Sequence, residues 1–112
     1  MKKLEMIIRP EKLEDLKEVL DQIGVNGMTV STVMGCGHQR GIKDIYRGAE
    51  LTINLLHKVK VETVVVDDMV EDIIQKVRET VSTGNVGDGK IFVYNVESAV
   101  RIRTGERGDK VI

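Results

Sequence analysis

The feature that most constrains the fold is a strand–helix–strand pattern that occurs twice within 112 residues. A loosely alternating segment over 2–9 predicts the first strand, and Pro10 suits the first turn of the helix that follows. Gly24 suits the end of that helix, and the segment over 28–34, rich in Val and Thr, predicts a second strand. The apolar positions of this helix follow helical spacing: Leu13, Leu16, Leu20 and Ile23.

The second half of the chain repeats this order. A β-branched segment over 58–66 predicts a strand, and Asp67 and Asp68 are candidate caps of the next helix. A strand over 91–96 follows, and then a short strand over 100–103. The apolar positions of the second helix again follow helical spacing: Val70, Ile73, Ile74, Val77 and Val81.

This order of elements predicts one α+β domain over 1–112 with the split βαβ, ferredoxin-like arrangement. Two helices can cover only one face of a four-stranded sheet. Ile7, Val64 and Val66 indicate apolar positions on the other face, and such positions favour cover. The sequence therefore predicts self-association.

Two segments have no convincing period. The first, over 35–57, has 23 residues and separates the two halves. A segment of this length without regular structure inside a compact domain is typical of a functional loop. The second is the polar tail over 104–112, which we expect to be mobile.

The composition excludes several classes of protein. A formal net charge of −1 disfavours nucleic-acid binding, and two Tyr and one Phe are too few for a base-stacking platform. Charged residues make up 31% of the chain, and its apolar runs are too short to span a bilayer. The first residues do not resemble a signal peptide, and the single Cys36 excludes a disulfide framework. We therefore expect a cytoplasmic protein.

A glycine-rich turn precedes the last long strand. Residues 84–90 satisfy the spacing G-x-x-x-x-G-K, but Ile91 follows where a Walker A loop needs Ser or Thr and then a helix. The turn is therefore not a Walker motif. Its glycines still allow backbone N–H groups to converge on a phosphate, and Lys90 adds a positive charge. A plain helix-to-strand turn with a solvated lysine explains the spacing equally well.

Other candidate site residues give weaker signals. Arg101 and Arg103 stand two apart on a predicted strand, so their side chains share one face and suit a polyphosphate. The alternative is a charged edge strand that discourages aggregation. His38 and His57 could ligate a metal ion, but no carboxylate or thiolate pattern accompanies them. Neither a Ser–His–Asp set nor a pair of carboxylates can be argued from the spacing.

Three segments together resemble the P-II nitrogen regulatory proteins, and the resemblance covers essentially the whole chain. The first is Gly27-Met28-Thr29-Val30, with Gly35 and Gly37 downstream. The second is Tyr46-Arg47-Gly48-Ala49-Glu50, followed by Lys58-Val59-Lys60. The third and most specific is Thr83 with Gly87-Asp88-Gly89-Lys90-Ile91-Phe92-Val93, followed by Arg101-Ile102-Arg103-Thr104-Gly105-Glu106.

The resemblance implies a homotrimer of ferredoxin-like subunits that binds ATP or ADP in the clefts between subunits. With Mg²⁺ and ATP bound, such proteins also bind 2-oxoglutarate. A T-loop, here 36–57, then changes shape and docks on a partner or leaves it. A B-loop, here 82–90, holds the phosphates, and arginines of a C-terminal loop, here 98–112, reach them from the neighbouring subunit. The implied partner is an ammonium transporter in the membrane, or else glutamine synthetase or the nitrogenase system.

Matching these motifs position by position implies roles for individual residues. Those implied in nucleotide binding are Gly27, Met28, Thr29, Gly35, Gly37, His38, Glu62, Val64, Gly87, Asp88, Gly89, Lys90, Arg101 and Arg103. Those implied in 2-oxoglutarate binding are Gln39, Arg40, Gly41 and Lys58, and Gln39 also ligates Mg²⁺. Those implied in partner binding are Tyr46, Arg47, Gly48, Ala49, Glu50 and Leu51.

Four positions depart from the family pattern. Leu51 stands where many bacterial members carry a tyrosine that is uridylylated, so this modification cannot occur at residue 51. Ala49 lacks the hydroxyl group that cyanobacterial relatives phosphorylate. His38 is shorter than the arginine that is common at its position, and His57 replaces a usual proline at the exit of the T-loop.

Two alternative functions remain open at this point. A small ATP-hydrolysing enzyme would need an acid or a base, for which Asp88 and Glu62 are weak candidates. A divergent nucleotide- or metal-binding trimer would use His38 and His57. The identity of the partner, and whether ATP or ADP favours docking, do not follow from the sequence.

Overall fold

The computed structural model describes residues 1–36, 44–46, 49–51 and 55–112. Its elements follow the order strand–helix–strand, a small β-ribbon, and again strand–helix–strand. For Tyr46, Ala49, Glu50 and Leu51 it describes the backbone alone. The predictions for the following residues lie outside the described part of the chain: Gly37, His38, Gln39, Arg40, Gly41, Arg47 and Gly48.

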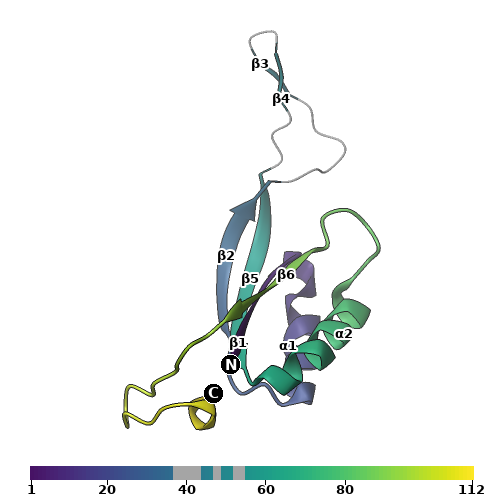
Figure 1. Cartoon of the computed structure of the whole chain (residues 1–112). Helices are drawn as coiled ribbons and strands as arrows, with labels where there is room; N and C mark the ends of the chain where they lie inside the picture. The colour runs from purple at the N-terminus through teal and green to yellow at the C-terminus, as the bar shows by residue number, and fades with distance from the viewer. Residues whose placement is uncertain (37–43, 47–48, 52–54) are drawn as a thin grey trace.

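Four strands form one antiparallel sheet in the order β2-β5-β1-β6, and both helices pack on the same face (Figure 1). β5 separates β1 from β2, and β1 separates β5 from β6. This is the split βαβ, ferredoxin-like arrangement that the sequence predicts. The strands are β1 (Lys2–Ile8), β2 (Thr29–Gly35), β5 (Leu56–Val65) and β6 (Gly89–Asn95), and the helices are α1 (Leu13–Ile23) and α2 (Val70–Val81).

The core lies between the sheet and the two helices. Alternate side chains of β1 and β5 are buried, and so is one stripe of each helix, as the two periodicities require. Thr63 is buried on the same face, and its hydroxyl group donates to the carbonyl of Gly27 at 2.6 Å. The buried hydrophobic residues are Leu4, Met6, Ile8, Leu16, Val19, Leu20, Val59, Val61, Val65, Val70, Ile73, Val77 and Val81.

The boundaries of α1 confirm the expected signals. Pro10 opens a short 3₁₀ turn, η1 (Pro10–Lys12), which leads directly into the helix. Gly24 ends the helix with a φ of 96°, and its N–H donates to the carbonyls of Leu20 at 3.2 Å and Asp21 at 3.1 Å. Glycine is favoured here because a side chain is strained in this left-handed conformation. Among the described residues, no helix is long and apolar enough to cross a bilayer.

The predicted cap of α2 is wrong. Asp67 and Asp68 lie in a 3₁₀ turn, η2 (Asp67–Met69), and neither this turn nor α2 receives a side-chain capping bond from the described residues. The carboxylate of Asp67 instead contacts the amino group of Met1 at 2.9 Å. An ammonium group competes well for a carboxylate, because a contact between two charges is stronger than a capping bond from a neutral N–H.

The segment between the two halves has more regular structure than its sequence predicts. β2 continues to Gly35, and β5 begins at Leu56. Two short strands, β3 (Asp44–Tyr46) and β4 (Ala49–Leu51), pair antiparallel and form a ribbon. Strands of three residues are too short for an alternating pattern to reveal them.

The predicted strand over 100–103 is also wrong. Val100 forms an isolated bridge with Arg107, and the chain turns between the two residues. The N–H of Gly105, which has a φ of 75°, donates to the carbonyl of Arg101 at 2.7 Å and closes the turn. The alternation of apolar and charged residues is present, but the chain leaves the sheet before it can pair.

The tail over 104–112, which was expected to be mobile, is folded. The N–H of Arg101 donates to the carbonyl of Glu106 at 2.9 Å, and the chain ends in a 3₁₀ turn, η3 (Asp109–Val111). Ile112 is half-buried and lines a small hollow with Val64 and Gly24. The C-terminal loop therefore lies at the end of the sheet where β1 begins and β5 ends, with the two termini close together (Figure 1).

Candidate functional site

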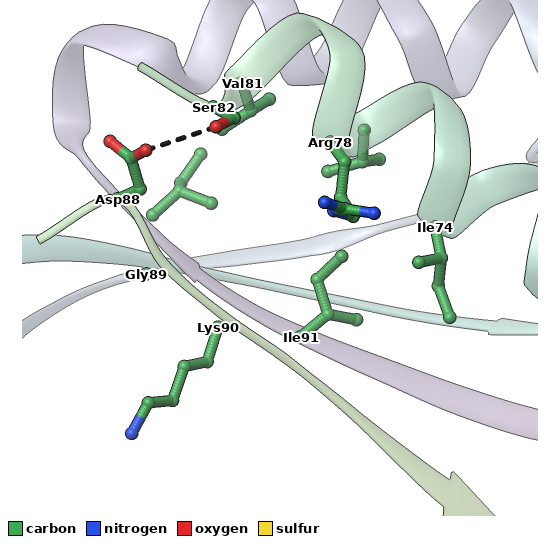
Figure 2. Close-up of a pocket in the computed structure, with 10 residues that line it drawn as sticks. Ile74, Arg78, Val81, Ser82, Asp88, Gly89, Lys90 and Ile91 are labelled. Atoms are coloured by element: carbon green, nitrogen blue, oxygen red, sulfur yellow. Dashed lines mark hydrogen bonds between the residues drawn. The ribbon is translucent and has the colours of Figure 1, made fainter. Parts of the chain in front are cut away.

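The B-loop connects α2 to β6 and wraps around the carboxylate of its own Asp88. The backbone N–H groups of Thr83 and Gly84 donate to this carboxylate at 2.8 and 2.9 Å. The Ser82 hydroxyl donates to it at 3.3 Å, as Figure 2 shows, and the Thr83 hydroxyl does so as well. The N–H groups of Thr83 and Gly84 are thus engaged within the loop and are not available to a phosphate.

Arg9, which follows β1, ties the B-loop to the sheet. Its Nε donates to Asp88 Oδ1 at 3.2 Å, and its Nη2 donates to the carbonyl of Val86 at 2.8 Å. The hydrogen bonds from Thr83 above all, together with that from Arg9, hold the pKa of Asp88 well below its usual range. Asp88 is therefore a firmly ionised structural group rather than an acid or base. Arg9 is not among the predicted site residues, because 79 residues separate it from Asp88 and no local pattern marks the contact.

Two glycines allow the B-loop to join the sheet at close range. Gly87 and Gly89 have φ values of 98° and 108°. A Cβ on Gly89 would lie 2.8 Å from the carbonyl carbon of Ile7 and closer still to its oxygen. β6 begins at this glycine, two residues before the predicted start, with Gly89 paired to Ile8 and Lys90 to Ile7. The close approach therefore requires glycine at position 89.

Two lysines, Lys90 at the end of the B-loop and Lys58 of β5, lie on the face of the sheet that the helices leave open. Lys90 is on this face by its register, and Figure 2 shows its side chain pointing away from α2. Lys58 lies next to Gly35, and its Nζ donates to the carbonyl of Gly87 at 2.6 Å. Lys58 thus links the base of the T-loop to the B-loop. Two ammonium groups beside a glycine-rich backbone suit a phosphate or a carboxylate.

The residues implied in nucleotide binding fall into two groups at opposite ends of the sheet. Lys58 lies near the start of β5 and Val64 near its end, and the six residue steps from one to the other span about 20 Å. One chain therefore does not bring the two groups together. The group at the B-loop end contains Gly35, Gly87, Asp88, Gly89 and Lys90. The group at the other end contains Gly27, Met28, Thr29, Glu62 and Val64, with Arg101 and Arg103 in the nearby C-terminal loop.

The open face of the sheet carries a network of charges between these groups. Glu62 contacts Lys60 at 3.3 Å and Lys3 at 4.0 Å. The Tyr94 hydroxyl donates to Glu5 at 3.2 Å, which raises the pKa of Tyr94, and the ammonium group of Lys3 lies over the Tyr94 ring. Glu62, a weak candidate for acid–base chemistry, is therefore a member of an ion-pair network.

Arg101 and Arg103 do not share one face of a strand, because the backbone turns at this point. Arg101 contacts Glu106 at 3.0 Å and the carbonyl of Lys110 at 3.5 Å. Arg103 is exposed, and Ile102 between the two arginines is fully exposed. The C-terminal loop thus presents a cation and an apolar side chain outward, a combination that suits contact with another molecule.

The metal-binding hypothesis gains nothing from the described part of the chain. Within it, no group of three or more His, Cys, Asp or Glu side chains could hold a metal ion. His57 and Cys36 are exposed at the two ends of the T-loop. His38, the other histidine of the metal-binding hypothesis, lies outside the described residues.

Asp88→Asn is expected to lower the free energy of unfolding by about 2 kcal/mol at pH 7, because a neutral amide replaces a charged acceptor of several hydrogen bonds. A depressed pKa stabilises the fold above the ordinary value of 3.8, and this effect is lost as the pH falls toward the folded-state pKa. The difference between variant and wild type should therefore shrink below about pH 4. Urea unfolding at pH 7 and at pH 3 measures both effects.

Asp72→Asn is the matched control, since Asp72 is exposed and lies 4.0 Å from Lys76. Its replacement should change the free energy of unfolding by less than about 0.5 kcal/mol. Equal losses in the two variants, or a loss at Asp88 that does not depend on pH, would contradict the structural role of this carboxylate.

The sequence of the chain matches a known protein family. The family described as Nitrogen regulatory protein P-II matches residues 1–106. The nitrogen regulatory protein P-II of Haemophilus influenzae is 52% identical over 112 residues, which cover 100% of both chains. The nitrogen regulatory protein P-II of Rhodospirillum rubrum is 51% identical over 112 residues, with the same complete coverage. Nitrogen regulatory protein P-II 1 of Escherichia coli K12 is 49% identical, also over 112 residues and 100% of both chains.

Proposed function

Because the chain belongs to the nitrogen regulatory protein P-II family, we propose that it is a trimeric sensor of ATP or ADP and of 2-oxoglutarate. Through the T-loop it controls a partner protein of nitrogen assimilation. Members of this family regulate partner proteins in nitrogen control, and the relatives are named as regulators rather than enzymes. The proposal adds the ligands, the assembly and the mechanism.

The separation of the two groups of nucleotide residues carries the proposal. About 20 Å of β5 lies between Lys58 and Val64, so a nucleotide site is complete only where the B-loop end of one chain meets the other end of its neighbour. Head-to-tail contacts of this kind close into a ring, and three chains then have three identical sites. The fully exposed Ile102, and Phe92 on the open face of the sheet, support burial between copies.

Each side of this shared site has its own task. Lys90 and the backbone of Gly87 hold the phosphates, because an ammonium group and N–H groups stabilise negative charge. Arg103 of a neighbouring chain reaches the same phosphates from the C-terminal loop. The adenine base rests on aliphatic walls such as Val64 and Met28, since a chain with two Tyr and one Phe has few rings to offer.

Lys58 connects 2-oxoglutarate to the same site. Its ammonium group contacts a neutral acceptor, the carbonyl of Gly87, and no carboxylate of the described residues, so its charge can bind the carboxylate of an effector. A carboxylate that draws Lys58 away releases Gly87, and the base of the T-loop then changes together with the B-loop. Mg²⁺ joins the effector to ATP, and the family pattern alone assigns its ligand Gln39.

The T-loop makes the contact with the partner. Its described backbone contains the β3–β4 ribbon, an extended shape that can enter a pore or a groove. The first candidate partner is an ammonium transporter, with Arg47 as the residue that enters the pore. Glutamine synthetase and the nitrogenase system are the alternatives. Leu51 has no hydroxyl group, so uridylylation does not control the T-loop at this position.

Calorimetry with 2-oxoglutarate tests the proposed function. Binding is expected when Mg²⁺ and ATP are present and is expected to disappear without nucleotide, because the effector completes a site that the nucleotide builds. Lys58→Met should weaken effector binding by about 30-fold through the loss of one charge-assisted contact. Lys17→Met, on α1 and away from the open face of the sheet, is the control, since Lys17 contacts Glu14 at 3.3 Å and faces no effector.

Two results would contradict the proposal: binding of 2-oxoglutarate in the absence of nucleotide, or no binding under any condition. Sustained hydrolysis of ATP that is lost in Lys90→Ala would favour the small enzyme instead. A pull-down from lysate, with ADP or with Mg²⁺–ATP and 2-oxoglutarate, identifies the partner as the protein whose capture changes between the two conditions.

A further inference from the structure

A hollow of about 360 Å³ lies between α2 and the first residues of β6 (Figure 2). Its apolar walls come from Ile74, Val77 and Val81 of α2 and from Ile91 of β6, with Ile8 at its base. This volume is within the range of small-molecule sites, which run from about 300 to 1,000 Å³. The hollow is therefore large enough to hold a small ligand.

The hollow opens on the opposite face of β6 from the side chain of Lys90, and it shares Asp88, Gly89 and Lys90 of the B-loop as part of its lining. Ile91 pairs with the buried Met6 and so faces the helices, whereas Lys90 pairs with Ile7 and faces the other way. Figure 2 shows the same division: Ile91 points toward α2, and the side chain of Lys90 points away from it. A ligand in the hollow would therefore contact the Ile91 side of β6 rather than the ammonium group of Lys90.

The charges around the hollow favour an anion. Asp88 lies at one end, but its carboxylate already accepts hydrogen bonds from the B-loop and from Arg9. Arg78 reaches from α2 toward Ile91, and Figure 2 shows its guanidinium group at the hollow. Among the residues that the structure describes, no carboxylate lies within ion-pair distance of Arg78.

We infer that this hollow binds an aliphatic carboxylate. The carboxylate contacts the guanidinium group of Arg78, whose planar arrangement of N–H donors matches its two oxygens. The aliphatic chain lies against Ile74 and Ile91, which are only partly buried and from which it displaces water. Ser82, Asp88 and Lys90 also line the hollow, but the Asp88 carboxylate is engaged in the B-loop and the Lys90 side chain points away. A guanidinium group beside aliphatic walls therefore suits a monoanion with a saturated chain.

Octanoate is the probe, and the isoleucine methyl groups of the full-length protein are the readout. In a methyl NMR titration without nucleotide, the signals of Ile74 and Ile91 should shift and saturate, while Ile23 on α1 should stay in place. Arg78→Gln should weaken octanoate binding by about fivefold and leave the binding of octanol unchanged, because octanol carries no charge. Lys76→Gln, which removes a cation of the same helix that faces Asp72, should change neither ligand.

Three results would overturn the inference. The first is the absence of saturable shifts at Ile74 and Ile91, and the second is an equal shift at Ile23. The third is an Arg78→Gln variant that binds octanoate as well as the wild type does or that loses octanol to the same degree. The titration needs no nucleotide, so its outcome does not depend on the proposed function.

Discussion

Gly89→Ala is expected to lower the free energy of unfolding by about 4 kcal/mol, a large part of the stability of a domain of this size. The backbone at this glycine has a φ of 108°, where a side chain costs about 1–2 kcal/mol. The added Cβ also meets the carbonyl group of Ile7, and overpacking of this kind costs about 1–3 kcal/mol. β1 cannot withdraw, because it pairs with β5 on its other side. Urea unfolding followed by circular dichroism measures the loss.

Gly84→Ala separates the two contributions. Gly84 lies in the same loop with a φ of 83°, but a Cβ at this position would meet nothing within 4 Å. The control variant should therefore lose about 1 kcal/mol, the cost of the backbone conformation alone. Similar losses in the two variants would show that the close approach of the B-loop to β1 is not what requires glycine at position 89.

Mixed oligomers of two inactive variants should recover nucleotide binding. Lys90→Ala removes the proposed phosphate contact at the B-loop end, and Arg103→Ala removes the one proposed in the C-terminal loop. Each variant alone should bind ATP about 50-fold more weakly, through the loss of a charge-assisted contact. If each site uses Lys90 of one chain and Arg103 of the next, every trimer that contains both variants restores about one of its three sites. Calorimetry on co-expressed, doubly tagged protein counts these sites.

Arg107→Ala is the matched control, because Arg107 is an exposed arginine of the same loop that the family pattern does not assign to the nucleotide. This variant alone should bind ATP like the wild type. Mixtures of Lys90→Ala and Arg103→Ala that recover no site would mean that one chain builds the whole site, and the proposed head-to-tail arrangement would then be wrong.

The elements that follow from local pattern are the ones that the sequence predicts well. Leu4, Met6 and Ile8 alternate along a strand and become one buried face of β1. Gly24 ends α1 because its left-handed backbone conformation disfavours most other residues. The end of the helix can therefore be predicted from this single residue. One face of a strand or helix is apolar when the spacing of its apolar residues matches the periodicity of that strand or helix. Such a prediction needs no knowledge of which segments pack against it.

The predictions that fail depend on what lies next to a segment. Apolar and charged residues alternate over 100–103 as they do in a strand, but Val100 forms an isolated bridge with Arg107 and does not join the sheet. Aspartate is favoured at helix caps, yet the carboxylate of Asp67 contacts the amino group of Met1 instead. In each case a contact distant in the sequence overrides a local preference, and no window of a few residues contains that contact.

The candidate site divides in the same way. The glycines and Lys90 of the B-loop form a local motif, because a close backbone approach and a positive charge need residues that are adjacent in the chain. Arg9 holds that loop from 79 positions away, and only the folded chain brings the guanidinium group to Asp88. The hollow at Arg78 likewise exists only because α2 packs over β6, so its charge and its walls come from separate segments.

The sequence alone therefore determines which faces of the strands and helices are buried, and where the chain can turn back on itself, because both depend on residues close to one another. Only the tertiary structure decides the strand order β2-β5-β1-β6 and, with it, the placement of the proposed nucleotide-binding residues at two ends of the sheet. Pairing between distant strands sets this order. It brings Lys58 beside Gly87 and leaves Val64 about 20 Å along the strand from Lys58.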